Sequence, residues 1–359
     1  MLKEIEMEQE VIESFRKCIE AIPGLKLEVL PRNRNQPYAD FVFKIIGKGW
    51  DQLIYVETKT LGTPKQVREA VNSLIRIADP RKAAYGIVVA PFISTKTAAI
   101  CKMNGIGFVD LSGNCYLQFK QVVISIENKA NKFPFREGLS SIYAPKSERI
   151  LRVLLTFPYR GWKVIDLAEE ADISLGMISH VGKKLIEEEW AERNSDGISL
   201  TKPESLLEDW SKNYTFQRNK LLNYYTLLSV PELELGLGQI CKQQGILYAL
   251  TGFSAANKIA PMVKGQRSMI YLGAEIEKLA EKLSLKRVES GANVVLIKPY
   301  DEGVFWKSES IGDVMVANPI QVYLDLKRYP GRGEEAADQI LKEIIKTRWQ
   351  LQKMTINSL

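Results

Sequence analysis

The sequence predicts a multidomain protein that combines α/β and α+β folds. Its 359 residues are enough for two or three domains. Helical and strand-like patterns alternate over residues 1–128, short helices dominate residues 147–214, and a mixed α+β pattern returns over residues 215–359. Residues 129–146 carry prolines, serines and basic residues without periodicity, which predicts a linker.

The composition is that of an ordinary globular protein, with 45% hydrophobic and 26% charged residues. The net charge is only +6, so any DNA contact must come from a local basic patch. The four cysteines form no C-x-x-C pair, which argues against structural zinc and favours a reducing cytoplasm. The charged N-terminus is no signal peptide, and no apolar run is long enough to cross a membrane. The single histidine, His180, excludes mechanisms that need two.

Residues 1–128 predict an α/β sandwich. Apolar residues between positions 11 and 22 recur at helical spacing. A second helix opens with Thr63 as its N-cap and Pro64 in its first turn. The predicted order after the first helix is strands at 25–30, 39–46 and 52–58, a helix at 65–78, a strand at 85–90, a helix at 94–103, and strands at 107–110, 115–119 and 122–126.

Two carboxylates and a lysine stand at strand ends in this segment. Alternation places Glu57 and Lys59 on one face and turns Thr58 away, while Asp40 begins the preceding strand. Asp40 and Glu57 could hold Mg²⁺, and Lys59 could orient an attacking water. Magnesium is the one cofactor that the sequence suggests, and only for a nuclease.

The order of elements and these three residues resemble the PD-(D/E)xK nuclease family over about residues 5–126. The resemblance implies a restriction-endonuclease-like sandwich in which Asp40, Glu57 and Lys59 are catalytic and the two carboxylates bind the metal. It also suggests Glu10 or Glu13 as an extra carboxylate and Gln66 as a helical glutamine. Pro37 is not adjacent to Asp40 as in the family motif, and the fold is also compatible with DNA binding without cleavage.

Residues 147–214 predict a winged helix-turn-helix. The order is a serine-capped helix at 147–156, a helix at 162–171, a tight turn, a helix at 175–189 with Ser174 as N-cap, and a hairpin around residues 195–197. The predicted core of this module consists of Leu167, Ala168, Ile173, Val181 and Leu185.

The third helix of this order enters the major groove of DNA. Residues expected to face the DNA are Ser174, Gly176, Met177, Ser179, His180, Lys183 and Lys184. The two lysines can neutralise phosphates, and Arg193 on the wing can reach the neighbouring backbone. The acidic run at 187–189 opposes this interpretation, and a protein-interaction module is the alternative.

The C-terminal segment carries the stretch ALTGFSAA, residues 289–294, residues 317–326 and a PGRG turn. Together these resemble the AbiEi-like type IV antitoxins, over about residues 147–350. The resemblance implies a transcriptional repressor and toxin neutraliser. Gly252 and Ser254 after a strand also resemble a nucleotidyltransferase core, but the next strand, residues 268–272, has no carboxylate. We therefore expect a degenerate nucleotidyltransferase-like domain without metal or transfer activity, in which Ser254 packs structurally.

Three functions remain open from the sequence. The first is a DNA-binding regulator or antitoxin-like repressor, and the second is a Mg²⁺-dependent nuclease targeted by the winged helix. The third is a protein-interaction scaffold. Expected partners are double-stranded DNA, with a partner toxin and a second copy of the chain left open, and no membrane.

Overall fold

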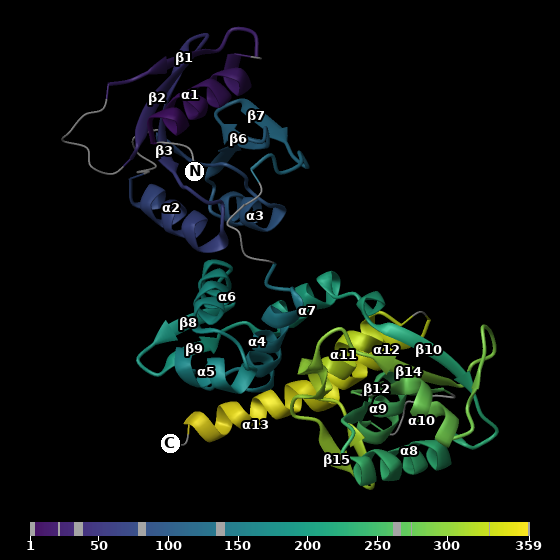
Figure 1. Ribbon diagram of the computed structural model, residues 1–359. Helices are drawn as coiled ribbons and strands as arrows, with labels where there is room; N and C mark the ends of the chain where they lie inside the picture. Colours follow the sequence, from purple (N-terminus) through teal and green to yellow (C-terminus); the bar gives the residue numbers. More distant parts are fainter. Residues whose placement is uncertain are drawn as a thin grey trace. The chain divides into compact units, whose positions relative to one another are not determined.

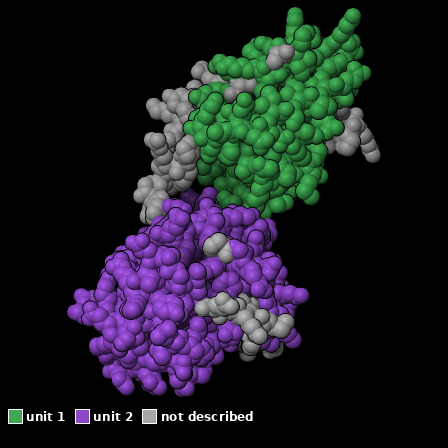
Figure 2. Space-filling view, turned by 90° about the vertical axis from the view of Figure 1, so that its right-hand side faces the viewer, with its two compact units in different colours: residues 1–139, 187–189 green, residues 140–186, 190–359 purple. Residues whose placement is uncertain are grey.

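The computed structural model describes residues 4–20, 22–31, 39–77, 84–133, 141–260, 267–273, 275–329 and 331–357. The chain divides into two compact units, residues 1–139 with 187–189 and residues 140–186 with 190–359 (Figure 2). Both contain helices and a seven-stranded sheet, which confirms a multidomain α/β protein. Part of the predicted linker, residues 134–140, lies outside the described residues.

The first unit is built on a sheet in which the strands follow chain order, β1 to β7 (Figure 1). Strands β3, β4 and β5 are parallel, and the other neighbours are antiparallel. Its elements are α1 (Glu4–Glu20), β1 (Lys26–Val29), β2 (Phe41–Gly47), β3 (Trp50–Thr58), α2 (Pro64–Ile77), β4 (Ala84–Ala90), α3 (Thr95–Met103), β5 (Gly107–Asp110), β6 (Cys115–Phe119) and β7 (Val122–Ile126).

The helices of this unit cover both faces of the sheet. Phe15 and Ile19 of α1 are fully buried in one apolar cluster, together with inward residues of β2, β3 and β4. Leu74 of α2 and Cys101 of α3 are buried in a second cluster with Val88 of β4. Because neighbouring strand residues point to opposite faces, these clusters lie on opposite sides of the sheet.

The second unit holds a group of helices, a hairpin and a second sheet. The first part consists of α4 (Pro145–Thr156), α5 (Val164–Ala171), α6 (Leu175–Glu187), β8 (Ala191–Asn194), β9 (Gly197–Leu200) and α7 (Pro203–Asn213). The remaining helices are α8 (Val230–Gln244), α9 (Gly252–Ile259), α10 (Ile276–Lys282), α11 (Pro319–Lys327), α12 (Gly333–Ile340) and α13 (Lys346–Asn357).

The sheet of this unit has the strand order β13-β10-β14-β12-β11-β16-β15. Its strands are β10 (Lys220–Tyr225), β11 (Tyr248–Leu250), β12 (Ser268–Leu272), β13 (Lys286–Arg287), β14 (Val294–Lys298), β15 (Glu309–Ile311) and β16 (Val314–Val316). Parallel and antiparallel neighbours alternate from β14 to β15, so the sheet is mixed.

The predicted serine cap of α4 is wrong. Helix α4 begins two residues earlier than expected, with Ala144 as N-cap and Pro145 in the first turn. Ser147 lies inside the helix, where its hydroxyl donates to the sulfur of Met177 at 3.7 Å. Proline favours the first turn because its missing N–H would have no helical partner there.

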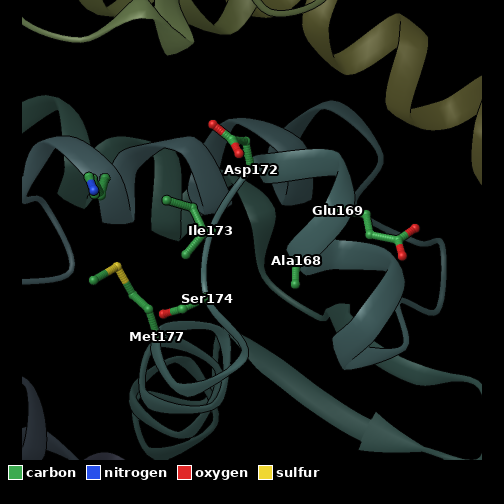
Figure 3. Close-up of a pocket in the computed structure, with 7 residues that line it drawn as sticks. Ala168, Glu169, Asp172, Ile173, Ser174 and Met177 are labelled. Carbon is green, nitrogen blue, oxygen red and sulfur yellow. The ribbon is translucent and has the colours of Figure 1, made fainter.

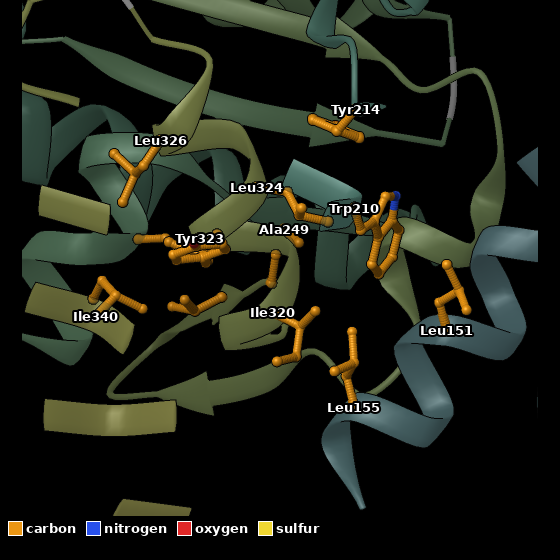
Figure 4. Close-up of a cluster of buried hydrophobic side chains, with 14 of the residues drawn as sticks. Leu151, Leu155, Trp210, Tyr214, Ala249, Ile320, Tyr323, Leu324, Leu326 and Ile340 are labelled. Atoms are coloured by element: carbon orange, nitrogen blue, oxygen red, sulfur yellow. The ribbon is translucent and has the colours of Figure 1, made fainter. Parts of the chain in front are cut away.

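Helix α4 belongs to the same apolar core as the C-terminal segment. Leu151 and Leu155 of α4 face Trp210 and Ile320, and all four side chains are buried (Figure 4). The helices of the predicted winged helix therefore do not close a core of their own. They share one with α11 of the C-terminal segment.

Helix α13 caps the end of α4. The indole Nε1 of Trp349 donates to the Leu155 carbonyl at 2.7 Å, and Gln352 Nε2 donates to the Thr156 carbonyl at 2.9 Å. The last carbonyls of a helix have no partner within it, so donors from another element stabilise that end. Among the described residues no helix is both long and apolar enough to span a bilayer.

Candidate functional site

Helix α6 separates apolar and polar residues onto opposite faces. Ile178, Val181 and Leu185 are fully buried, whereas Ser179 and Lys183 are exposed. Residues four apart lie above one another on a helix, so Ser179 and Lys183 share the solvent face. Ser174 and Lys184 are exposed as well, and residues 174–186 contain no acidic side chain. This face therefore offers hydroxyls and positive charge, and Glu187, four residues after Lys183, adds a negative charge at its C-terminal end.

Met177 and His180 are less accessible than expected, since both are half-buried. Met177 lines a hollow of about 410 Å³ at the turn between α5 and α6, with Ser174 beside it (Figure 3). The other residues that line this hollow are Lys146, Ala168, Glu169, Asp172 and Ile173. Asp172 ends α5 in a left-handed conformation (φ 52°), which produces the tight turn.

The hairpin β8–β9 lies directly against α6. A Cβ atom on Gly182 would come within 2.7 Å of Ile198 Cδ1 and 3.9 Å of Arg193 Nη2. Gly182 therefore permits the close approach that brings Arg193 alongside α6. Gly197 is required in the hairpin because its φ of 122° suits glycine and a Cβ there would lie 2.2 Å from the Trp162 carbonyl oxygen.

Two further cations near the hairpin were missed by the sequence reasoning. The Arg160 guanidinium stacks over Trp162 at 3.9 Å from the ring centre, and Trp162 pairs with Ile198 of β9. Arg160 and Lys163 are both exposed. The sequence does contain a signal for this contact. Arg160 and Trp162 flank Gly161, and an arginine close to a tryptophan can stack over its ring.

In the first unit, the three predicted catalytic residues lie where β2 begins and β3 ends. Phe41 pairs with Val56, which sets Asp40 opposite Glu57. Lys59 Nζ lies 3.4 Å from Glu57 Oε2, and Ser73 donates to Glu57 Oε1 at 3.1 Å. The structure thus brings Glu57 and Lys59 together.

Asp40 makes a contact that alternation did not predict. Its Oδ2 accepts hydrogen bonds from the Thr58 backbone N–H at 2.8 Å and from the Thr58 hydroxyl at 2.6 Å. Thr58 was expected to point away. Asp40 precedes the first residue of β2, so its side chain is free to turn across the end of β3.

Burial raises the pKa of Glu57, and the negative charge of Asp40 raises it further, while Lys59 and Ser73 act in the opposite direction. A divalent cation placed between two carboxylates relieves their repulsion, because each carboxylate can give it an oxygen ligand. No group of three or more His, Cys, Asp or Glu side chains gathers in the described part of the chain. Any Mg²⁺ held here would have these two carboxylates as its protein ligands, with water or phosphate as the others.

The accessory residues have different surroundings. The side-chain Oε1 of Gln66 accepts a hydrogen bond from the Leu61 backbone N–H at 3.1 Å, two residues after Lys59 in the chain. Glu10 is exposed, and Glu13 pairs with Lys17 in solvent at 2.8 Å. The basic loop at residues 32–35, a further candidate for phosphate contact, lies outside the described residues.

The nucleotidyltransferase-like residues of the second unit are packed structurally. Ser254 is buried, and its hydroxyl accepts from the Met269 N–H at 3.0 Å and lies 3.4 Å from the Arg267 carbonyl. Helix α9 begins at Gly252, where a Cβ would meet the Met269 sulfur at 2.6 Å. Both residues therefore pack against the start of β12.

Two charged side chains of α4, Glu148 and Arg152, form a buried cluster with residues of other elements. Glu148 is fully buried and accepts from Trp210 Nε1 at 3.3 Å, from Arg218 at 3.3 Å and from the Tyr300 hydroxyl. Arg152, 1% exposed, lies 3.7 Å from Glu148 and donates to Gln321 at 2.9 Å. Burial raises the pKa of Glu148, and the nearby arginines oppose that rise.

Gln321 connects this cluster to a second buried carboxylate, Asp325. Asp325 accepts hydrogen bonds from Thr251 at 2.5 Å, Tyr214 at 2.6 Å, Tyr271 at 2.9 Å and Gln321 at 2.9 Å. Burial nevertheless raises the pKa of Asp325 to about 6.

Comparison with protein families gives a match for the C-terminal half. The family model described as "Transcriptional regulator, AbiEi antitoxin, Type IV TA system" matches residues 199–346. This supports the AbiEi-like resemblance and points to a transcriptional regulator or antitoxin of a type IV toxin–antitoxin system. Residues 1–198 lie outside the match. No curated protein and no solved structure matches the chain.

Proposed function

We propose that the chain is a DNA-binding transcriptional regulator of the antitoxin type, and that α4, α5, α6 and the β8–β9 hairpin act as a winged helix-turn-helix. The observation that carries this proposal is the solvent face of α6, where Ser179 and Lys183 are exposed above a buried apolar face. The family match to a transcriptional regulator over residues 199–346 supports the same function.

In this proposal α6 lies in the major groove. Ser174, Ser179 and His180 meet base edges, since hydroxyl and imidazole groups can donate or accept hydrogen bonds there. Lys183, Lys184 and Arg193 contact phosphates, and Arg160 and Lys163 extend the positive surface beside the wing. Met177 supports the turn before α6 rather than reading bases, because it is half-buried against Ser147.

Lys183→Ala is expected to weaken DNA binding about equally on every sequence. Each phosphate contact releases condensed counterions, so losing one lowers the slope of log K against log salt by about one. The measurement is fluorescence anisotropy over a salt series, with duplex DNA from upstream of the chain's own gene and with a shuffled duplex.

A control variant and a second test variant complete this experiment. Lys282→Ala removes an exposed lysine from α10 and should leave both the affinity and the salt slope unchanged. Ser179→Ala should reduce the preference for the cognate duplex over the shuffled one while keeping the salt slope. An unaltered affinity in both Lys183→Ala and Ser179→Ala would refute the placement of α6 in the groove.

The second candidate function is a Mg²⁺-dependent nuclease in the first unit. It is favoured by the placement of Asp40 opposite Glu57, with Lys59 at 3.4 Å from Glu57. Asp40 and Glu57 would hold the ion, which when bound would lower the pKa of a water molecule. Lys59 would hold that water in position or stabilise negative charge on the phosphate.

If this candidate is correct, the purified chain nicks supercoiled plasmid with Mg²⁺ and not with EDTA. Glu57→Gln should reduce nicking to background, because it removes one of the two charges that hold the ion. Glu28→Gln is a matched control, since Glu28 is an exposed glutamate on β1 of the same sheet. Equal nicking by wild type and Glu57→Gln would mean a contaminating nuclease.

The remaining assignments are also proposals. The antitoxin class suggests a toxin as a partner besides DNA. We propose that the first unit acts in DNA contact or cleavage and that residues 215–359 provide a non-catalytic surface. Self-association stays a prediction.

A further inference from the structure

A second hollow of the second unit, of about 250 Å³, lies between α4, α5 and the short 3₁₀ helix η3 (Glu302–Phe305). Its apolar wall includes Val153 of α4, Phe305 and Trp306. Sites for small organic ligands usually enclose about 300–1,000 Å³ and combine apolar walls with a few polar groups. This hollow therefore has the composition of a ligand site and the size for a small ligand.

The two aromatic rings of this hollow are held in place by their neighbours. The indole Nε1 of Trp306 donates to Glu170 Oε1 of α5 at 3.0 Å, and its ring makes a T-shaped contact with Phe157 at 6.3 Å between ring centres. Phe305 makes a T-shaped contact with Tyr271 at 6.4 Å. The face of an aromatic ring attracts cations, so both rings favour a positively charged ligand.

The charged residues that line the hollow are mostly acidic. They are Glu170, Asp172 and Glu302, and Arg149 is the one base among the lining residues that the structure describes. The Arg149 guanidinium is already bound, since Nε and Nη2 donate to Asp301 at 2.8 and 3.1 Å and Nη1 donates to Asp172 at 2.8 Å. The charge that a ligand meets in this hollow is therefore negative.

The chain's own Lys307 shows which charge this place attracts. Its Nζ lies 6.0 Å from the centre of the Trp306 ring and 3.9 Å from Glu170 Oε1. Lys307 is half-exposed and is not among the residues that line the hollow, so it leaves the space open. An ammonium group inside the hollow would meet the same ring and the same carboxylate, with Glu302 in addition.

We propose that this hollow binds a small organic cation, namely a primary ammonium group on an apolar body. The ammonium group pairs with Glu170 and Glu302, and the body packs against Phe305 and Trp306. A neutral ligand of the same shape lacks the attraction to the carboxylates, and an anion is repelled by them.

The test is a ligand-observed NMR titration of the folded full-length chain near neutral pH, with phenethylamine as the probe. We expect a Kd of about 1 mM or lower. Phenethyl alcohol, which has the same body without the charge, should bind about tenfold more weakly, and phenylpropionate should not bind. Glu302→Gln should weaken phenethylamine about threefold. Glu289→Gln is the matched control, because Glu289 is an exposed glutamate of the same unit outside the hollow.

Three outcomes would overturn the proposal. Phenethylamine could fail to bind, the alcohol could bind as tightly as the amine, or Glu302→Gln and Glu289→Gln could weaken the amine equally. The titration contains no DNA, so its result does not depend on the placement of α6 in the major groove.

The position of the hollow makes it an effector site of the regulator, a role that rests on the proposed function. Asp172 lines the hollow, ends α5 and produces the turn before α6, and Arg149 ties it to Asp301 beside η3. Saturating phenethylamine is expected to change the DNA affinity of wild type about fivefold or more, and that of Glu302→Gln less at the same concentration. Fluorescence anisotropy with the cognate duplex measures this change. Ligand binding without a change in DNA affinity would refute the effector role, whereas ligand binding by a chain that binds no DNA would refute the proposed function and support the site.

Discussion

Glu148→Ala is expected to lower the free energy of unfolding of the second unit by about 3–5 kcal/mol. The substitution removes the carboxylate beside Arg152, which is 1% exposed and has no route to bulk water. It also takes an acceptor from Trp210 and Arg218. A buried charge without its counter-ion is among the most destabilising changes that a single substitution makes. Urea unfolding followed by tryptophan fluorescence measures the loss.

The chain offers a matched control for this result. Glu208 and Lys212 are also a glutamate and a base four residues apart on a helix, but both are more than 60% exposed. Glu208→Ala is expected to cost less than about 1 kcal/mol, since water screens the pair. If the two variants unfold at the same urea concentration, the Glu148 cluster does not stabilise the fold.

The second large effect is a loss of stability as the pH rises from about 4 to about 6. The pKa of Asp325 is raised from 3.8 to about 6 in the folded chain. The folded state therefore binds more protons than the unfolded state in this window, and stability falls as pH rises through it. A shift of about two units corresponds to about 3 kcal/mol, fully present below pH 4 and lost above about pH 6.

Asp325→Asn should flatten this dependence, because the amide does not titrate. Asp338→Asn is the control, since Asp338 is 61% exposed and pairs with Lys327 at the surface. Unfolding in urea at pH 4 to 7 distinguishes the variants. A wild-type slope retained in Asp325→Asn would assign the pH dependence to another group.

The sequence predicts the first unit well because its signals are local. Strands β5, β6 and β7 begin and end at the predicted residues, since alternating apolar residues stop at the turn around Gly113 and at Lys120. Helix α2 begins at Pro64, one residue from the prediction. Each boundary depends on residues within a few positions, which is the range over which propensity acts.

The sequence predicts parts of the second unit less well. Helix α8 was not predicted, although Ser229 and Glu232 form a capping box that marks its start. The polar core was not predictable, because Arg152 and Gln321 meet across 169 positions of the chain. Nothing local in either segment indicates that a charged side chain will be buried.

At the candidate sites, too, local sequence patterns predict some contacts and miss others. Helical periodicity identified the exposed face of α6, and strand alternation paired Glu57 with Lys59. Periodicity did not place Met177 against α4, nor did it turn Asp40 toward Thr58. These contacts depend on neighbouring elements and on a strand end, where alternation no longer restricts the side chain.

The cap that α13 places on α4 has a consequence for how this protein can change during evolution. Trp349 and Gln352 supply donors to the Leu155 and Thr156 carbonyls from nearly two hundred residues away in the chain. A recombination event that moved residues 147–214 alone into another gene would leave those carbonyls without these donors and would expose the apolar side of α4. Helices α4 to α6 and the C-terminal helix are therefore expected to be inherited together, and variation to arise by substitution on α6 rather than by exchange of these helices.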